Sequence, residues 1–252
     1  MEIRVRRVAE AKLSPDQLRQ VAERCAKGCC SITVYSPKGT TSASGFQVSL
    51  GLLTAKHTFD PHLYPGSADV IPGTVIKVQD LFNAYQEIET KVKMLSLNYD
   101  VAFLEKVAKL QDLPMGSTRD LAVGDEVIIL ATPQGLTNPD LAVYASSGKV
   151  LALAYVTPEI FLYSIPTVPG ASGGAIVNEY GEVIGIHLLA VAMEDQSYGA
   201  GLKIEAVQAA AQGTVYVPPE LYVLPGGIPW TTAVSAGAGL ALSLLVLEAL
   251  FK

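Results

Sequence analysis

Short apolar runs, separated by glycine, proline and polar residues, follow one another along most of the chain. Many of these runs are rich in β-branched residues, which is typical of strands. The first predicted set of strands spans 31–36, 44–49, 51–55, 75–78, 87–95 and 101–106. The second predicted set spans 126–131, 147–155, 160–165, 174–177, 183–189 and 198–203. Two sets of six strands predict an all-β fold made of two packed six-stranded β-barrels.

The polar and apolar pattern before the first strand is typical of a helix. Ser14 can cap it, Pro15 suits its first position, and Gln17 completes a capping box. Apolar residues then recur at helical spacing, so we expect this helix to end near Gly28. A second short helix is expected over 204–211.

The C-terminal pattern differs, because Glu248 is the only charged residue between Thr231 and Phe251. About 20 apolar residues suffice to cross a bilayer, so we predict a transmembrane or membrane-associated helix, with a buried or oligomer-forming helix as the alternative. The expected organisation is a helix-bearing N-terminal segment, two β-barrels, a Pro/Gly-rich linker and this apolar helix. Their respective ranges are 1–28, 29–116, 117–212, 213–229 and 230–252.

Composition narrows the classes of function. The chain has 252 residues and a net charge of −6, and it lacks a run of Lys or Arg, which argues against nucleic acid as the main partner. Its three cysteines cluster at Cys25, Cys29 and Cys30, which fits neither a disulfide framework nor a zinc site. We therefore expect free thiols, no metal and no cofactor. The N-terminus lacks the apolar core of a signal peptide.

Three separate segments carry residues that can cooperate in nucleophilic catalysis. His57 follows the apolar run 51–55, Asp100 directly precedes the apolar run 101–104, and Ser172 lies in a glycine-rich loop that begins at Gly170. A nucleophilic serine needs a base, an orienting carboxylate and N–H donors for the oxyanion. We assign His57 as base, Asp100 as orienting group and Ser172 as nucleophile. The N–H groups of Gly170 and Ser172 are the expected oxyanion-hole donors, because glycine permits the tight turn that aims them at one point.

With these residues, and with the sequences at 124–127 and 171–178, the chain resembles the chymotrypsin-like serine proteases. It is most similar to their HtrA-like and glutamyl endopeptidase branches and to the proteases of positive-strand RNA viruses. The resemblance covers roughly 31–207. It implies the two-barrel fold, the His-Asp-Ser triad and endopeptidase activity.

Specificity follows from positions around Ser172. Pro166 stands where a pocket for Arg or Lys carries a carboxylate, so a trypsin-type preference is not expected. Thr167 and His187 match positions that bind a P1 glutamate in glutamyl endopeptidases and in sobemovirus- and arterivirus-like proteases. A hydroxyl and an imidazole can both donate to a carboxylate, and His187 is the local side chain expected to supply positive charge. The resemblance also implies that the three residues after His187 take part in substrate binding; they are Leu188, Leu189 and Ala190.

The leading hypothesis is a membrane-associated serine endopeptidase that cleaves after Glu, with Gln as a second P1 residue. We expect a viral polyprotein-processing protease with a cytoplasmic protease domain, whose partners are a polypeptide substrate and a membrane. Glu220-Leu221, in the linker, is a candidate self-cleavage site. One alternative is a bacterial HtrA-like housekeeping protease of broader specificity. The other is an inactive protease-like membrane scaffold.

Overall fold

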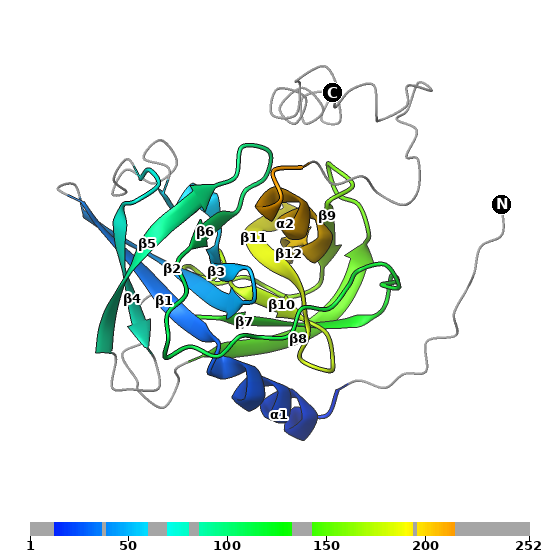
Figure 1. The fold of residues 1–252 in the computed structure, drawn as a ribbon. Helices are drawn as coiled ribbons and strands as arrows, with labels where there is room; N and C mark the ends of the chain where they lie inside the picture. Colours follow the sequence, from blue (N-terminus) through cyan, green and yellow to red (C-terminus); the bar gives the residue numbers. More distant parts are fainter. Residues whose placement is uncertain are drawn as a thin grey trace, which may run out of the picture.

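Two closed antiparallel β-barrels lie side by side in the computed structural model (Figure 1). The structure describes residues 13–36, 39–59, 70–80, 86–132, 143–193 and 196–214. The prediction of two six-stranded barrels preceded by a short helix is confirmed. The expected apolar helix over 230–252, the candidate cleavage site in the linker and most of the linker itself lie outside the described residues. Among the described helices, none is long and apolar enough to cross a membrane.

The first barrel carries the predicted base and its carboxylate. Its strands are β1 (Cys29–Ser36), β2 (Gly39–Val48), β3 (Gly51–Thr54), β4 (Val75–Asp80), β5 (Gln86–Leu95) and β6 (Ala102–Leu104). They pair in the closed order β1-β2-β3-β6-β5-β4. Apolar side chains such as Ile32, Leu52 and Leu104 are fully buried in its core. A short 3₁₀ helix, η1 (Lys56–Phe59), follows β3 where a strand end was expected.

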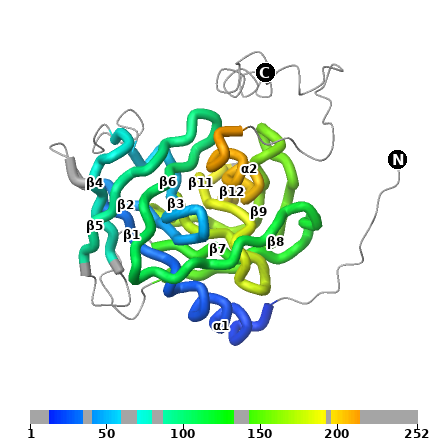
Figure 2. The backbone as a smooth tube through the Cα atoms, in the orientation of Figure 1, coloured from blue at the N-terminus to red at the C-terminus, as the bar shows by residue number. Residues whose placement is uncertain are grey.

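The second barrel carries the glycine-rich loop. Its strands are β7 (Glu126–Ala131), β8 (Tyr144–Ala152), β9 (Ile160–Tyr163), β10 (Ala175–Val177), β11 (Val183–Met193) and β12 (Gln196–Lys203). They pair in the closed order β10-β11-β12-β9-β8-β7. Figure 2 follows the chain as it leaves the first barrel after β6 and enters the second at β7. Helix α2 (Ile204–Ala211) then packs against β11 and β12.

Helix α1 (Pro15–Ala26) precedes the first barrel in the chain but packs against β7 and β8 of the second (Figure 1). Its predicted capping box is present, with the side chains of Ser14 and Gln17 each bonded to the main chain of the other. Arg24 donates to the carbonyl of Tyr180 at 2.7 Å, and the N–H of Leu13 donates to Glu126 at 2.8 Å. The helix therefore joins the start of the chain to the second barrel.

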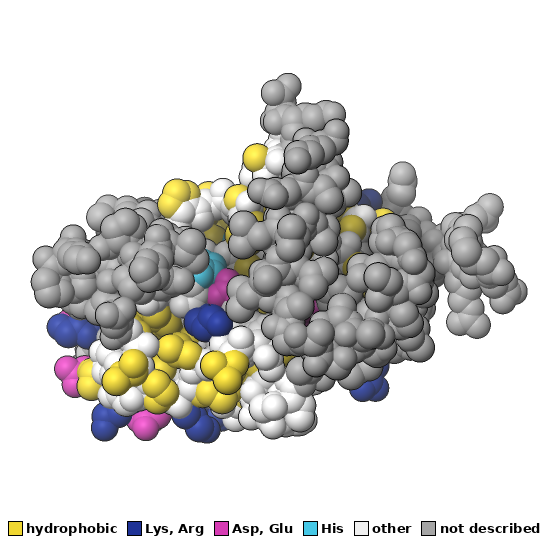
Figure 3. Space-filling view, turned by 90° about the horizontal axis from the view of Figure 1, so that it is seen from above, with side chains coloured by type: hydrophobic (Ala, Val, Ile, Leu, Met, Phe, Trp, Pro, Cys, Tyr) yellow, Lys and Arg dark blue, Asp and Glu magenta, His cyan; other side chains and the backbone are white. Residues whose placement is uncertain are grey.

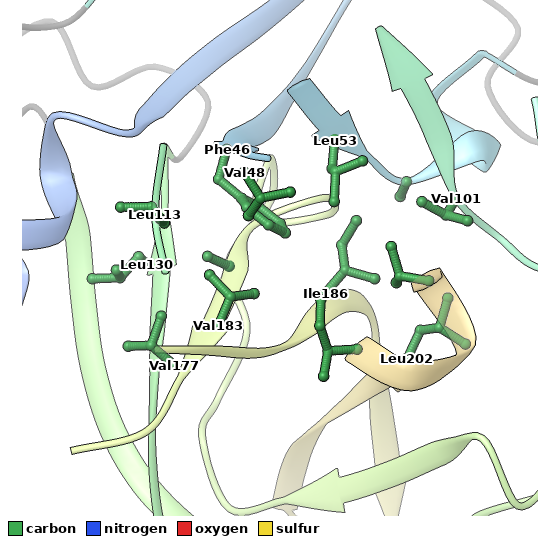
Figure 4. Packing of buried hydrophobic residues seen from close by; sticks show 14 of the residues in the cluster. Phe46, Val48, Leu53, Val101, Leu113, Leu130, Val177, Val183, Ile186 and Leu202 are labelled. Carbon is green, nitrogen blue, oxygen red and sulfur yellow. The ribbon is translucent and has the colours of Figure 1, made fainter. Parts of the chain in front are cut away.

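Apolar side chains from both barrels form one continuous cluster between them (Figure 4). Phe46 and Leu53 from the first barrel face Leu130 and Ile186 from the second, and all four are almost completely buried. Burying such side chains contributes about 1.5–3 kcal/mol each, so this contact holds the barrels in a fixed relation. Loops from the two barrels can therefore build one site.

The three cysteines, Cys25, Cys29 and Cys30, are buried and form no disulfide bond. Burial raises the thiol pKa of Cys25, an effect that the charge and hydrogen bond of Arg24 oppose. Burial also raises the thiol pKa of Cys29, and the neighbouring Cys25 adds to that rise. All three therefore behave as packing residues.

Candidate active site

His57 and Asp100 are joined by two hydrogen bonds. The main-chain N–H of His57 donates to Oδ1 of Asp100 at 2.8 Å, and His57 Nδ1 lies 2.5 Å from Oδ2. The two side chains are 13% and 30% exposed, so the pair is sheltered but reachable. Figure 3 shows a histidine and an acidic side chain side by side at the surface of one face.

The protonation of Asp100 decides how the pair works. Burial of the Asp100 carboxyl would by itself raise its pKa. Hydrogen bonds from His57, together with the positive charges of His57 and Lys56, outweigh this effect and lower the pKa below the ordinary value. Asp100 is therefore an anion at neutral pH and can only accept hydrogen bonds. The Nδ1 of His57 must then carry a proton, so in the neutral ring Nε2 is the nitrogen that can accept one and act as a base.

Local structure holds these two residues together. Asp100 ends a turn closed by a bond from the N–H of Ser96 to the carbonyl of Val101, at 3.0 Å. Lys56, next to the histidine, donates from its ammonium group to the carbonyl of Ser96 at 2.7 Å. Lys56 thus fastens η1 to the Asp100 turn and adds positive charge beside the carboxylate, a role that was not predicted.

Ser172 lies in a loop that is bonded at both ends. The N–H of Ala171 donates to Val168 at 3.0 Å, and the N–H of Gly174 donates back to Ala171 at 2.9 Å. Gly170 has a φ of 87°, in the left-handed region that favours glycine. Among the described residues, no acceptor is bonded to the N–H of Gly170 or of Ser172. Both N–H groups are therefore available to an acceptor, and their role as oxyanion donors stays a prediction.

The hydroxyl of Ser172 donates to the carbonyl of Leu188 at 3.0 Å. We expected its proton to be directed at His57; in this structure a strong main-chain acceptor on β11 takes it. Rotation about the Cβ–Oγ bond of Ser172 can redirect this proton.

The loop packs against the segment that leads into His57. A Cβ added at Gly173 would lie 2.3 Å from the carbonyl oxygen of Ser44 and 2.9 Å from the main-chain nitrogen of Ala55, two residues before the histidine. The N–H of Gly173 also donates to the carbonyl of His187 at 2.8 Å. Only glycine fits this contact, so the residue after Ser172 lets the two barrels meet at the site.

His187 departs from expectation in its charge. It is 1% exposed, and burial together with the charge of His57 lowers its pKa to about 3. The correction is that His187 is neutral at physiological pH and supplies no positive charge, because solvation of an imidazolium is lost at this buried position.

A neighbour that was not predicted, Tyr163, sets the tautomer of His187. Its hydroxyl lies 2.5 Å from Nδ1 of His187. Burial raises the pKa of Tyr163 well above its ordinary value, so the phenol keeps its proton. Among the described residues its hydroxyl has no other hydrogen-bond partner, so we assign this proton to the bond with Nδ1 of His187. The Nδ1 of His187 therefore accepts, and its Nε2 carries the N–H.

The other predicted substrate-binding residues lie at different depths. Thr167 is partly exposed on the segment that leads into the Ser172 loop. The side chain of Leu188 is buried in the cluster between the barrels, so its main chain is the part that can face a substrate. Leu189 is 48% exposed and Ala190 is also exposed on β11.

The sequence pattern of the trypsin-like peptidase domain matches residues 43–186, more than half of the chain. The chain belongs to the trypsin-like peptidase family. Within the described ranges, this member of the family has no group of three or more His, Cys, Asp or Glu residues that could hold a metal ion.

Two curated relatives show where the similarity lies. A glutamyl endopeptidase of Staphylococcus aureus (strain MRSA252) is 28% identical over 167 residues, which cover 62% of this chain and 45% of the relative. HhoA of Synechocystis sp., a candidate serine protease, is 33% identical over 114 residues, 42% of this chain and 29% of the relative. This trypsin-like peptidase chain therefore spans less than half the length of either relative.

A solved structure has the same fold. The active form of the Rv3671c protease from M. tuberculosis superposes with a TM-score of 0.61, covering 82% of this chain and 89% of that one. The sequence identity of 17% means that this likeness shows the two-barrel fold alone.

Proposed function

We propose that the protein is a serine endopeptidase in which His57, Asp100 and Ser172 act as one catalytic unit. The observation that carries the proposal is the doubly bonded His57–Asp100 pair beside a loop whose two N–H groups have no partner among the described residues. Acyl transfer to a serine requires a base held by a carboxylate, the serine itself and unpaired N–H donors for the oxyanion.

The proposed reaction has two halves. Ser172 turns from Leu188, gives its proton to Nε2 of His57, and attacks the substrate carbonyl. The N–H groups of Gly170 and Ser172 bind the resulting oxyanion, and Asp100 stabilises the imidazolium. His57 then protonates the leaving amine as the peptide bond breaks. Water, activated by the same histidine, hydrolyses the acyl-enzyme and regenerates the serine.

The test of activity is the full chain with a fluorophosphonate probe and with a library of peptide substrates. Wild type is expected to form a covalent adduct and to cleave peptides, whereas Ser172→Ala does neither and keeps its circular dichroism spectrum. In proteases of this chemistry, loss of the nucleophile costs about 10⁶-fold in kcat. A folded wild type that neither reacts with the probe nor cleaves would favour the scaffold alternative.

For specificity we propose a P1 side chain of glutamate or glutamine, held by Thr167 and His187. Two observations support this: the positions match those of glutamyl endopeptidases, and the Staphylococcus aureus relative is a glutamyl endopeptidase. The Nε2–H of a neutral His187 is a donor that suits either a carboxylate or an amide oxygen. Without a full positive charge at this site, discrimination between Glu and Gln should be weaker than discrimination against Arg or Phe.

Four peptides that differ only at P1, carrying Glu, Gln, Phe or Arg, test the specificity. Wild type should turn over the Glu and Gln peptides, and His187→Ala should lower kcat/KM for these two far more than for Phe, because it removes a buried donor. Because His187 is neutral, the Glu-to-Gln ratio should stay constant from pH 5.5 to 8, values that lie well above its pKa of about 3. Equal turnover of all four peptides by wild type would contradict this assignment.

A second candidate function, an HtrA-like protease of broader specificity, is favoured by the 33% identity to HhoA. The same P1 series separates it from the first, because a broad enzyme would accept the Phe peptide as well as the Glu peptide.

We further propose, from the sequence pattern alone, that the apolar tail attaches the protease to a membrane and that its substrate is a viral polyprotein. Flotation of the full chain with lipid vesicles, compared with a chain truncated after residue 214, tests the attachment.

A further inference from the structure

Ser44, on β2 of the first barrel, lies at the junction with the Ser172 loop of the second. It is 0% exposed, and all three of its polar groups are hydrogen bonded. Its N–H donates to the carbonyl of Ser172 at 2.9 Å, and its carbonyl accepts from the hydroxyl of Thr54 at 2.8 Å. These two bonds use main-chain groups that any residue at 44 would supply.

The hydroxyl of Ser44 makes contacts that depend on the side chain. It donates to the carbonyl of Gly170 at 2.7 Å and accepts from the N–H of Thr132 at 2.7 Å. A serine hydroxyl has a single proton to donate, and here that proton goes to the catalytic loop. The bond to Thr132 fixes the direction in which the hydroxyl points.

The bond to Gly170 acts on the peptide unit between the two expected oxyanion donors. That unit comprises the carbonyl of Gly170 and the N–H of Ala171, and it separates the N–H of Gly170 from the N–H of Ser172. Its N–H is bonded to Val168 at 3.0 Å, and its carbonyl is bonded to Ser44. A peptide unit is planar, so bonds at both ends fix its rotation. Without Ser44, a single bond would hold it.

Glycine makes this restraint necessary. Gly170 adopts a φ of 87°, and glycine can leave that region for many others at little cost. No Cβ limits the rotation of its peptide units, so the orientation of its N–H depends on the bonds made by its neighbours. Among the described residues, the Ser44 hydroxyl is the side chain that holds its carbonyl.

We propose that Ser44 is a positioning residue whose hydroxyl orients Gly170 so that the loop presents both N–H groups to the oxyanion. This rests on the proposed protease function. Ser44 touches no reacting atom in this assignment; it acts through the Gly170 carbonyl. Its effect should therefore appear in transition-state binding and leave ground-state binding of the peptide nearly unchanged.

The test compares Ser44→Ala with Thr132→Val in the full chain, using a peptide with Glu at P1. Both variants remove a buried hydroxyl at the same junction. The Thr132 hydroxyl bonds to the carbonyl of Cys30 and to the Ser44 hydroxyl, each at 3.2 Å, and makes no bond to the catalytic loop. Thr132→Val keeps the main-chain N–H that donates to the Ser44 hydroxyl at 2.7 Å, so the direction of that hydroxyl is retained. Ser44→Ala should lower kcat about 10- to 100-fold with little change in KM, because losing an oxyanion donor outright costs about 100- to 1000-fold. Thr132→Val should lower the melting temperature and leave kcat within about twofold of wild type.

The inhibition constant of a peptide aldehyde distinguishes the proposed role of Ser44 from a purely structural one. The adduct of the aldehyde with Ser172 carries the oxyanion, so its stability depends on the oxyanion donors. The inhibition constant of the aldehyde should weaken about 10- to 100-fold in Ser44→Ala, in parallel with kcat, while the matching peptide alcohol binds as before. If Ser44→Ala does not fold, Ser44→Cys serves in its place, because the thiol is a weaker donor of similar shape, and it should show a smaller loss of the same kind.

Unchanged kcat and aldehyde affinity in a folded Ser44 variant would overturn the proposal. Equal losses of kcat in Ser44→Ala and Thr132→Val would also overturn it, since the effect would then follow from general loosening of the junction. The proposed protease function fails differently: wild type itself would then neither cleave peptides nor react with a fluorophosphonate.

Discussion

At the scale of single residues, the bond between Asp100 and His57 determines which ring nitrogen holds the proton. An ionised Asp100 requires a proton on Nδ1, whereas an amide at the same place could equally stabilise the tautomer with the proton on Nε2. The chemistry of the pair therefore depends on the charge of the carboxylate more than on its shape.

Asp100→Asn should therefore lower kcat about 10⁴-fold at neutral pH and leave KM within a fewfold of wild type. Steady-state kinetics with one peptide substrate measures this, and a melting curve shows whether the variant is folded. Asp112→Asn is a suitable control, because Asp112 is an exposed carboxylate of the first barrel that pairs with Lys106. Near-normal turnover by a folded Asp100→Asn would remove Asp100 from the catalytic unit.

Tyr163→Phe should weaken recognition of the P1 side chain. It removes the donor to Nδ1 of His187, so the tautomer with the proton on Nε2 is no longer imposed. A net hydrogen bond is worth about 0.5–1.5 kcal/mol, so kcat/KM for Glu and Gln peptides should fall up to about tenfold. Tyr155 is a partly exposed tyrosine on the same barrel, and Tyr155→Phe should leave kcat/KM for both peptides unchanged.

The Phe-P1 peptide completes the experiment on Tyr163. Its kcat/KM should be the same for wild type and Tyr163→Phe, because it makes no hydrogen bond to His187. A parallel loss for all peptides would instead mean that Tyr163 supports the barrel and not the pocket.

Residues on β9 and β11 show what the sequence could not reveal about the site. Tyr163 pairs with Gly199 on β12, and His187 pairs with Gly201 on the same strand. They meet only because β12 lies between β9 and β11 in the closed barrel. Nothing in the sequence near either residue specifies that pairing. The glycine-rich loop at Ser172, by contrast, could be identified from the sequence because its conformation is local.

At the scale of elements, the sequence again predicts what local signals determine and misses what contacts between distant residues determine. The capping box of α1 and the apolar runs of the strands are local signals, and the predicted elements agree with the structure apart from their ends. The 3₁₀ helix η1 is four residues long and has no local signal. The N–H of His57 within it is bonded to Asp100, which lies 43 positions later in the chain. Short elements held by distant residues remain hidden in a sequence.

The turn at Gly173 provides a prediction about how elements meet. Gly173→Ala places a methyl group 2.3 Å from the carbonyl oxygen of Ser44, on a backbone with a φ of 83°. Gly73→Ala is a matched control, since Gly73 has a φ of 93° and nothing within 4 Å of an added Cβ. The control should lose about 1–2 kcal/mol of stability from backbone strain alone.

Gly173→Ala should lose about 1–3 kcal/mol more than the control, because overpacking adds to the strain. It should also lose nearly all activity, since either Ser172 or the β2 strand must move. Urea unfolding and peptide cleavage measure the two effects. Equal losses of unfolding free energy in Gly173→Ala and Gly73→Ala would show that the structure around Gly173 accommodates the added methyl group without further destabilisation.

At the scale of the whole molecule, the buried His187 links stability to pH. Its folded-state pKa of about 3 lies below the ordinary value of 6.5, so the unfolded chain binds more protons between these two values. The free energy of unfolding should therefore decrease as the pH falls from 6.5 towards 3, the range set by the two pKa values. Above pH 6.5 this contribution is fully present.

Urea unfolding at pH 7 and at pH 4.5 tests this linkage. Wild type should be less stable at pH 4.5, and His187→Gln should show a smaller difference between the two pH values, because the variant has no imidazole to protonate. The lowered pKa of Asp100 acts in the same direction but at still lower pH, below its ordinary value of 3.8. An equal pH dependence in wild type and His187→Gln would exclude His187 as its source.

The attachment of α1 has a consequence for the protein during its synthesis. The ribosome makes α1 before the first barrel and the first barrel before the second, so the segments that carry His57 and Asp100 are made while the second barrel is still missing. The surface that receives α1 includes Glu126 and Tyr180, and the closing strand β12 ends only at Lys203. Under the proposed mechanism, a nascent chain therefore carries a base without a nucleophile. Such a chain should be unable to cut itself or its neighbours until almost all of the second barrel has been translated.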